Sequence, residues 1–155
     1  MTPSRLFLLP VLVLALVLAG CGSDPPRPVT KAQYQQELDR LGQVASDAGT
    51  ELGRSIDIAT FNGNVDKFSD TLRDVAGQLD DLKPPANVQA ANATLADSFR
   101  DWADEMEPVK EARRKSIVEA RKALFRVGRS QPVLDARQAV KDLGDAGYDV
   151  RRLAI

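Results

Sequence analysis

The chain has 155 residues, enough for one folded domain, and its 43% hydrophobic and 28% charged residues are close to the averages of globular proteins. It contains one cysteine and no histidine, which excludes an internal disulfide and removes the residue that most often binds metals or acts as a general base. A formal net charge of −1 gives no overall attraction to nucleic acid, and an aromatic content of only 5% favours helices over a β-sandwich or barrel.

The first 20 residues have the pattern of a secretory signal peptide. A short polar segment that contains Arg5 precedes an apolar run over residues 6–19, which is shorter than the roughly 20 residues that a membrane-spanning helix needs. The run ends in Leu18, Ala19, Gly20 and Cys21, which resembles the lipobox of bacterial lipoproteins. The alternatives are an uncleaved signal anchor and an ordinary secretory signal followed by a chance cysteine.

The lipoprotein resemblance implies cleavage between Gly20 and Cys21. The Cys21 sulfur would then carry diacylglycerol through a thioether, and the freed amine is a second site for a fatty acyl group such as palmitate. Two or three acyl chains, at about 0.8 kcal/mol per buried CH2, hold a protein durably at a membrane. We therefore expect a lipid anchor in the cell membrane, a protein on the extracytoplasmic side, and a Pro-rich linker over residues 21–29 before a folded domain over residues 30–155.

The first predicted helix begins near Thr30, because Thr30 followed by Gln33 matches a capping box. Apolar or small residues then recur three or four positions apart, which is the spacing of one helical face. These residues are Tyr34, Leu38, Leu41, Ala45, Ala48, Leu52, Ile56 and Ala59. A turn is expected at residues 61–64, with Asn64 as the next N-cap. Three glycines, Gly42, Gly49 and Gly53, are expected to let a neighbouring helix approach closely.

The second predicted helix has the clearest periodicity in the chain. Its apolar positions are Val65, Phe68, Leu72, Val75, Leu79 and Leu82, and the Pro84–Pro85 pair ends it. The junction of Leu82, Lys83, Pro84, Pro85 and Ala86, followed by an alanine-rich helix, resembles small helical lipoproteins of high-GC Gram-positive bacteria. Most of those proteins have no assigned function, and the resemblance implies no active site.

The third predicted helix runs from about residue 86 to residue 127 and is kinked at Pro108, because the apolar face continues on both sides of that proline. The alternative is two helices, with Pro108 at the start of the second. A turn follows at residues 128–131, and a fourth helix is expected from Pro132 to about Leu153. The predicted fold is therefore all-α, an up-and-down bundle of about four helices with a long kinked third helix.

A basic stretch is the first candidate interaction site. Arginines and lysines dominate residues 110–129, and the candidate contacts with an anionic surface are Lys110, Arg113, Arg114, Lys115, Arg121, Lys122 and Arg126. Two interpretations are open for this stretch. It is either ordinary solvated charge near a helix end, or a surface that contacts anionic lipids, cell-wall polyanions or an acidic protein. Nucleic acid is not expected as a partner, because only Phe125 is available in this stretch to stack on bases.

A second candidate site is an apolar groove formed by Phe99, Trp102 and Met106, which lie on one face of the third helix; core packing is the alternative. Asp66, Asp70 and Asp74 share a helical face, but we interpret them as solvated carboxylates because three charges on one helix do not converge on an ion without further ligands. No serine has a histidine to activate it, so no enzyme and no cofactor are expected. The favoured hypothesis is a non-enzymatic envelope module that binds an unidentified protein or polyanion. The alternative hypothesis is a carrier or sensor of a small apolar ligand or lipid bound near Trp102.

Overall fold

The computed structural model describes residues 29–153, and every regular element in this range is helical. The helices are α1 (Lys31–Gly53), α2 (Ile58–Asp81), α3 (Gln89–Glu105), α4 (Glu107–Ala112), α5 (Ile117–Val127) and α6 (Gln131–Asp145), with short 3-10 turns η1 (Ala86–Val88) and η2 (Arg151–Leu153). The predicted signal peptide, the lipidated Cys21 and the linker before Val29 lie outside the described residues.

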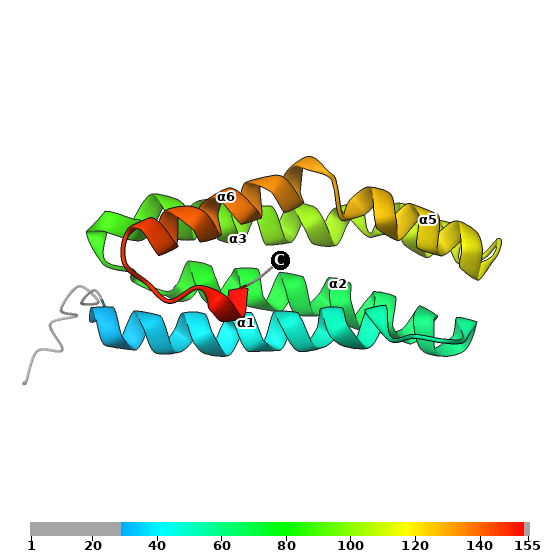
Figure 1. The fold of residues 1–155 in the computed structure, drawn as a ribbon, viewed down its shortest axis with the longest axis horizontal. Coiled ribbons are helices and arrows are strands. Elements are labelled where there is room, and N and C mark those ends of the chain that lie inside the picture. The colour runs from blue at the N-terminus through cyan, green and yellow to red at the C-terminus, as the bar shows by residue number, and fades with distance from the viewer. Residues whose placement is uncertain (1–28, 154–155) are drawn as a thin grey trace, which may run out of the picture.

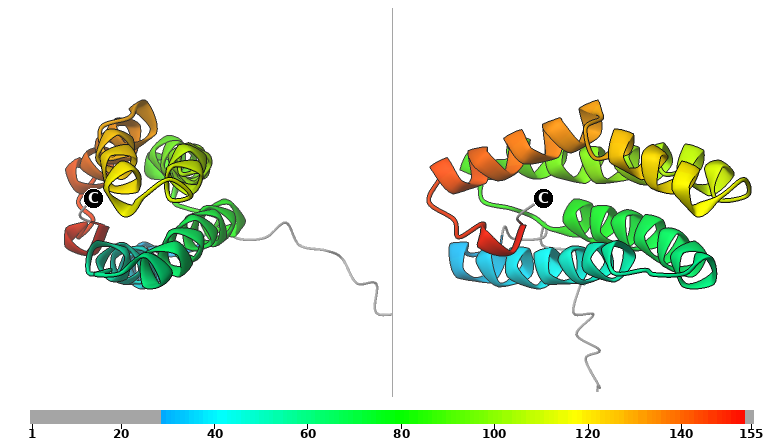
Figure 2. Two further views of the ribbon diagram at one scale, coloured as in Figure 1. Left: turned by 90° about the vertical axis from the view of Figure 1, so that its right-hand side faces the viewer. Right: turned by 45° about the vertical axis from the view of Figure 1, so that its right-hand side comes forward.

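The helices form an elongated bundle in which successive rows run in opposite directions (Figures 1 and 2). α1 and α2 are antiparallel, α3 runs back along α2, and α4 continues in the direction of α3. α5 and α6 then follow one another in the return direction, with α5 against α4 and α6 against α3. The all-helical class is confirmed. If α3 and α4 are counted as one long bent helix, the described residues form five helices where four were predicted.

The predicted start of the first helix is confirmed. The backbone N–H of Gln33 donates to Thr30 Oγ1 at 3.2 Å, and the Thr30 N–H donates to Gln33 Oε1 at 2.9 Å, which completes the capping box. Val29 is partly buried against the core, and its N–H donates to the Lys83 carbonyl at 2.9 Å. The chain therefore enters α1 at a fixed angle beside the end of α2.

The prediction that the first turn lies at residues 61–64 is wrong. α1 ends at Gly53, and Asp57 caps α2 by accepting a hydrogen bond from the Thr60 N–H at 2.8 Å. Phe61 therefore belongs to α2 and its side chain is buried in the core, whereas Ile56 in the turn is 88% exposed. The error has a physical reason: the three-to-four spacing of apolar residues continues across the turn, so the periodicity of the sequence does not mark it.

The bend predicted near Pro108 is present, but the prediction that this helix reaches residue 127 is wrong. Pro108 lies in the first turn of α4, where a missing N–H removes no helical hydrogen bond. The helix ends at Ala112 and the chain reverses before Ser116, whose Oγ accepts from the Glu119 N–H at 3.1 Å and caps α5. The apolar face again continues across the reversal, which hides it from the sequence pattern.

The fourth predicted helix is also shorter than expected. The break at residues 128–130 joins α5 to α6 within one row instead of reversing the chain, and α6 ends at Asp145 rather than near residue 153. Gly147 adopts a φ of 83°, a conformation that favours glycine. The N–H of Tyr148 donates to the Leu143 carbonyl at 3.2 Å and that of Gly147 to the Gly144 carbonyl at 2.9 Å. This is the Schellman arrangement that ends helices.

The segment after α6 crosses to α1 and joins the two outer rows of the bundle. Tyr148 packs edge-on against Tyr34, with ring centroids 5.2 Å apart. The Gln35 side chain donates to the Asp149 carbonyl at 2.8 Å and accepts from the Asp149 N–H at 2.7 Å. η2 then packs on α1 at Gly42. The sequence pattern missed this crossing, because its docking depends on contacts between distant parts of the chain.

A buried polar network joins the first three helices. The Tyr34 hydroxyl donates to Asn92 Oδ1 at 2.9 Å, and Asn92 Nδ2 donates to the Leu79 carbonyl at 2.8 Å. Burial raises the pKa of the Tyr34 phenol above its ordinary value, and the neighbouring Tyr148 raises it further. Because both side chains are satisfied, the network fixes the relative positions of α1, α2 and α3 without an unpaired polar group.

We expect Gly42→Ala to destabilise the protein. A Cβ atom at Gly42 would lie 2.7 Å from the Arg152 carbonyl oxygen, so the backbone of η2 would have to move. Gly77→Ala is the matched control, because a Cβ atom at position 77 would have no neighbour within 4 Å and the helical propensity of alanine should add about 1 kcal/mol. Urea unfolding of the two variants measures the difference. Equal free energies of unfolding for the Gly42→Ala and Gly77→Ala variants would show that the η2 backbone does not pack tightly against residue 42.

We also expect an alkaline loss of stability that depends on Tyr34. Its folded-state pKa is raised, so its contribution is fully present below the ordinary tyrosine pKa of 10.0 and is lost as the pH rises above that value. The free energy of unfolding should fall by up to about 1.4 kcal/mol per pH unit from this group. Tyr34→Phe should flatten this part of the profile, and identical slopes above pH 10 in both proteins would contradict the assignment.

Candidate functional site

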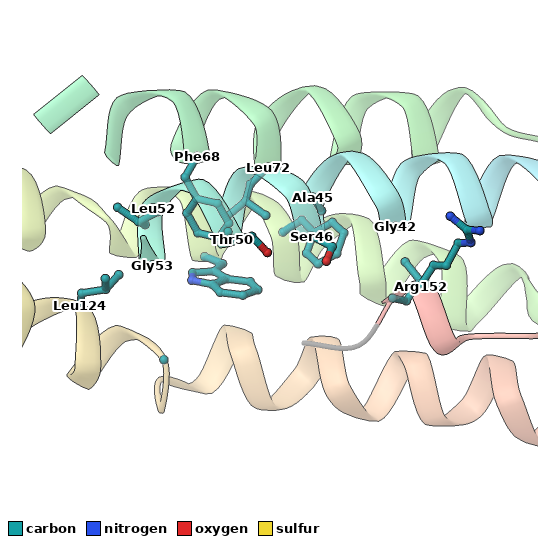
Figure 3. A pocket seen from close by; sticks show the side chains of 15 residues that line it. Gly42, Ala45, Ser46, Thr50, Leu52, Gly53, Phe68, Leu72, Leu124 and Arg152 are labelled. Carbon is teal, nitrogen blue, oxygen red and sulfur yellow. The ribbon is translucent and has the colours of Figure 1, made fainter. Parts of the chain in front are cut away.

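A cavity of about 400 Å³ lies in the middle of the bundle (Figure 3). Residues from α1, α2, α3, the end of α5 and η2 line it, so it lies between the two outer rows, beside the C-terminal segment that joins them. Its apolar walls are Leu52 of α1, Phe68 and Leu72 of α2, Phe99 and Trp102 of α3, Leu124 of α5 and Leu153 of η2.

Small residues of α1 leave the space that the cavity occupies. Gly42, Ala45, Gly49 and Gly53 all line it. The glycines were expected to admit a neighbouring helix, but a close approach occurs only at Gly42, where the backbone of η2 packs. A Cβ at Gly49 would lie 3.5 Å from Phe68, and one at Gly53 would have no neighbour within 4 Å. The sequence pattern singles out these glycines but does not reveal that they line a cavity.

Aromatic side chains form the wall opposite α1. The Trp102 ring lies edge-on to Phe68, with centroids 5.3 Å apart, and tilted to Phe99 at 6.3 Å. Trp102 Nε1 is buried and has no hydrogen-bond partner in the described part of the chain. Two of the three residues of the predicted apolar groove therefore line the cavity. The third, Met106, is fully buried in the core and does not line it, which corrects that part of the prediction.

Polar groups lie at the edge of the cavity. Ser46 and Thr50 of α1 are among the residues that line it, and Figure 3 shows their hydroxyl-bearing side chains beside the apolar wall. Arg152 of η2 also contributes to the lining, and its guanidinium donates to Gln43 Oε1 at 2.7 Å. An apolar interior with hydroxyls and a cation at its edge suits an apolar molecule that carries a polar end.

The basic stretch divides into an inward and an outward part. Arg113 donates to the Asn62 carbonyl at 2.9 Å and pairs with Asp66 at 3.0 Å, and the largely buried Lys110 lies 3.8 Å from the same carboxylate. Arg121 donates to the Ser55 carbonyl at 2.8 Å. These cations fasten the α4–α5 hairpin to α1 and α2. The remaining predicted contacts are exposed: Arg114, Lys115, Lys122 and Arg126.

The carboxylates of Asp66, Asp70 and Asp74 on α2 do not meet at a common position where they could bind an ion. Asp66 is occupied by Arg113 and Lys110, and Asp70 lies 3.6 Å from Arg73. Over residues 29–153, no cluster of three or more acidic, histidine or cysteine side chains is placed to hold a metal ion. The aspartates therefore give no geometric support to a metal site.

No helix between residues 29 and 153 combines the length and the apolar character needed to cross a bilayer. No protein-family model matches the chain, and neither a curated protein nor a solved structure matches it. The geometry of this chain alone therefore supports the functional proposals below.

Proposed function

We propose that this chain is a lipid-anchored protein on the extracytoplasmic side of a bacterial cell membrane, and that its bundle carries a small apolar molecule or lipid. The observation that supports this proposal is the cavity of about 400 Å³ between α1 and the aromatic wall of α2 and α3. Its volume falls within the range of about 300–1,000 Å³ that is typical of small-molecule sites. The cavity is our reason for preferring the carrier hypothesis to the interaction-module hypothesis that the sequence favoured.

The lining favours an apolar ligand with one polar group. Phe68, Phe99 and Trp102 offer a large apolar surface, and burying it against a ligand is favourable by about 25 cal/mol per Å². The partnerless Nε1 of Trp102 costs about 1–3 kcal/mol as an unsatisfied buried donor. Because this nitrogen has almost no accessible surface, the polar group of a ligand would instead meet the Ser46 and Thr50 hydroxyls at the edge of the cavity.

The proposed anchor places the cavity close to a source of such ligands. Lipidation at Cys21 would leave only a short Pro-rich linker before α1, with a reach of roughly 20–25 Å at about 3 Å per residue. A carrier needs no catalytic group, which agrees with the absence of histidine from the sequence. The other hypothesis, contact with an envelope protein or polyanion, keeps the support of the exposed cations Arg114, Lys115, Lys122 and Arg126.

Filling the cavity should abolish ligand binding. We expect a brominated fatty acid to quench Trp102 emission in the purified full-length protein, because bromine quenches only at contact. Gly49→Leu places a side chain toward Phe68 and should remove the quenching. Gly77→Leu is the control, since position 77 is exposed and a Cβ there would have no neighbour within 4 Å.

Quenching that is equal in Gly49→Leu and Gly77→Leu would show that the fatty acid binds elsewhere, and the carrier proposal would fail. Native mass spectrometry of the protein isolated from envelopes adds a second readout. A small molecule should accompany the wild-type protein and be lost from Gly49→Leu.

The anchor is tested separately at Cys21. We expect the protein from membranes to begin at Cys21 and to exceed the unmodified mass by a diacylglycerol group, with or without a further acyl chain. Cys21→Ser should lose this mass because a hydroxyl does not replace the thiol in thioether formation. An intact Met1 terminus or an unmodified thiol in the wild-type protein would refute the lipoprotein proposal and leave the cavity proposal standing.

A further inference from the structure

The outer face of α5 exposes apolar side chains among cations. Val118 is 57% exposed and Phe125 61% exposed, and their separation of seven positions places them on one side of the helix. Arg121, Lys122 and Arg126 border a shallow hollow between them. The guanidinium of Arg129 stacks over the Phe125 ring at 4.1 Å from its centroid. This face of α5 therefore combines two exposed apolar side chains with a row of cations.

The same end of the bundle exposes two further apolar residues. Arg121 donates to the Ser55 carbonyl at 2.8 Å, so the α1–α2 turn lies beside α5. In that turn and just after it, Ile56 is 88% exposed and Ile58 is 42% exposed. We call this surface the basic tip and define it by Ile56, Arg114, Lys115, Val118, Lys122, Phe125 and Arg126.

The basic tip is predominantly positive. Arg114, Lys115, Lys122 and Arg126 are all exposed, and Arg129 adds a fifth cation beside Phe125. The acidic residues on the same hairpin are Glu107, Glu111 and Glu119. Glu107 lies 3.8 Å from Lys110, and Glu119 is paired with Lys122 at 2.9 Å. The interior of a protein interface is depleted in charges, whereas cations that flank exposed apolar side chains are typical of helices at a membrane surface.

We propose that the basic tip docks on the surface of a bilayer that contains anionic phospholipid. Ile56, Val118 and Phe125 would enter the headgroup region, and the flanking lysines and arginines would bind lipid phosphates. Charge complementarity selects this occupant over a zwitterionic surface, because cations near an anionic bilayer are attracted to its negative surface potential. Docking of this kind does not require a ligand in the cavity.

The position of the tip adds a geometric consequence. The chain enters α1 at the end of the bundle opposite the α4–α5 hairpin (Figure 1), and the 23 residues of α1 span about 35 Å between the two ends. A bundle that is tethered through the linker at one end and docked through the basic tip at the other lies along the bilayer instead of standing on it.

The test places a fluorescent reporter in the basic tip of the mature lipidated protein. Phe125→Trp in a Trp102→Phe background is reconstituted into vesicles of phosphatidylglycerol or of phosphatidylcholine, each with brominated acyl chains. We expect strong loss of emission in phosphatidylglycerol vesicles and little in phosphatidylcholine vesicles. Leu134→Trp in the same background is the control, because Leu134 is 47% exposed on α6 and should stay unquenched in both.

Charge variants separate docking from simple tethering. Replacing Arg114, Lys115, Lys122 and Arg126 with glutamine should abolish the quenching at position 125, because these cations are proposed to bind the lipid phosphates. All four side chains are exposed, so the substitutions should leave the helical circular-dichroism signal unchanged. Neutralising four exposed cations elsewhere (Arg40, Lys67, Lys141 and Arg151) should leave the quenching intact.

High salt should weaken the docking in the wild-type sequence, since it screens charges beyond about 3 Å at 1 M. An unquenched reporter at position 125 in phosphatidylglycerol, or equal quenching at positions 125 and 134, would overturn the proposal. Either result would leave the cavity test at Gly49 unaffected.

Discussion

The backbone of η2 rests on Gly42, and the form of the bundle depends on this contact. A carbonyl oxygen would lie 2.7 Å from any Cβ at that position, so the C-terminal segment packs there only because residue 42 is glycine. α1 contacts α2 and η2 extensively, while α6 packs on α3. The two outer rows are therefore joined by a thin segment of chain and not by two interlocking helices. Beyond this contact, Gly49 and Gly53 of α1 line the cavity; a Cβ at Gly49 would touch Phe68, and one at Gly53 would have no neighbour within 4 Å.

Polar contacts stabilise the bundle on both sides of this cavity. Tyr34, Asn92 and the Leu79 carbonyl form a buried network near the chain entry. At the other end, Arg113 and Arg121 bind backbone carbonyls of Asn62 and Ser55. Neutral hydrogen bonds such as those of Tyr34 and Asn92 contribute about 0.5–1.5 kcal/mol each, and those to charged groups about 1.5–3 kcal/mol. Both ends of the bundle are therefore held by specific polar contacts, while the middle contains the cavity. This arrangement allows an open interior without loosening the helices around it.

The sequence predicted the local features of this fold because local interactions determine them. The capping box at Thr30 and Gln33 and the proline ending of α2 need only neighbouring residues. The turn at residues 54–57 was predicted at residues 61–64, and the turn at residues 113–116 was not predicted, because the apolar spacing continues through both. Gly147 falls within the predicted fourth helix, although its φ of 83° marks the end of α6. The η2 contact and the cavity depend on residues more than a hundred positions apart, and no local pattern encodes them.

The candidate site shows the same division. Phe99 and Trp102 were predicted from helical spacing and do line the cavity, whereas Met106, one turn later, is turned into the core. The basic stretch was predicted as one surface, yet Lys110 and Arg113 are turned toward Asp66 of α2. Arg121 is exposed, but its guanidinium is bound to the Ser55 carbonyl. Charge along a sequence therefore overstates the charge available to a partner. What remains outward is the smaller set on the basic tip, which the structure places beside exposed apolar residues.

The two proposals meet at α5. Leu124 lines the cavity while its neighbour Phe125 is exposed on the basic tip, so a single helix separates the proposed ligand from the proposed membrane surface. The main partner of α5 is the short α4, and Arg121 supplies one bond to the α1–α2 turn. An element with few packed neighbours opens at a lower free energy than the core of a bundle. Of the helices that line the cavity, α5 is therefore the one expected to open most readily.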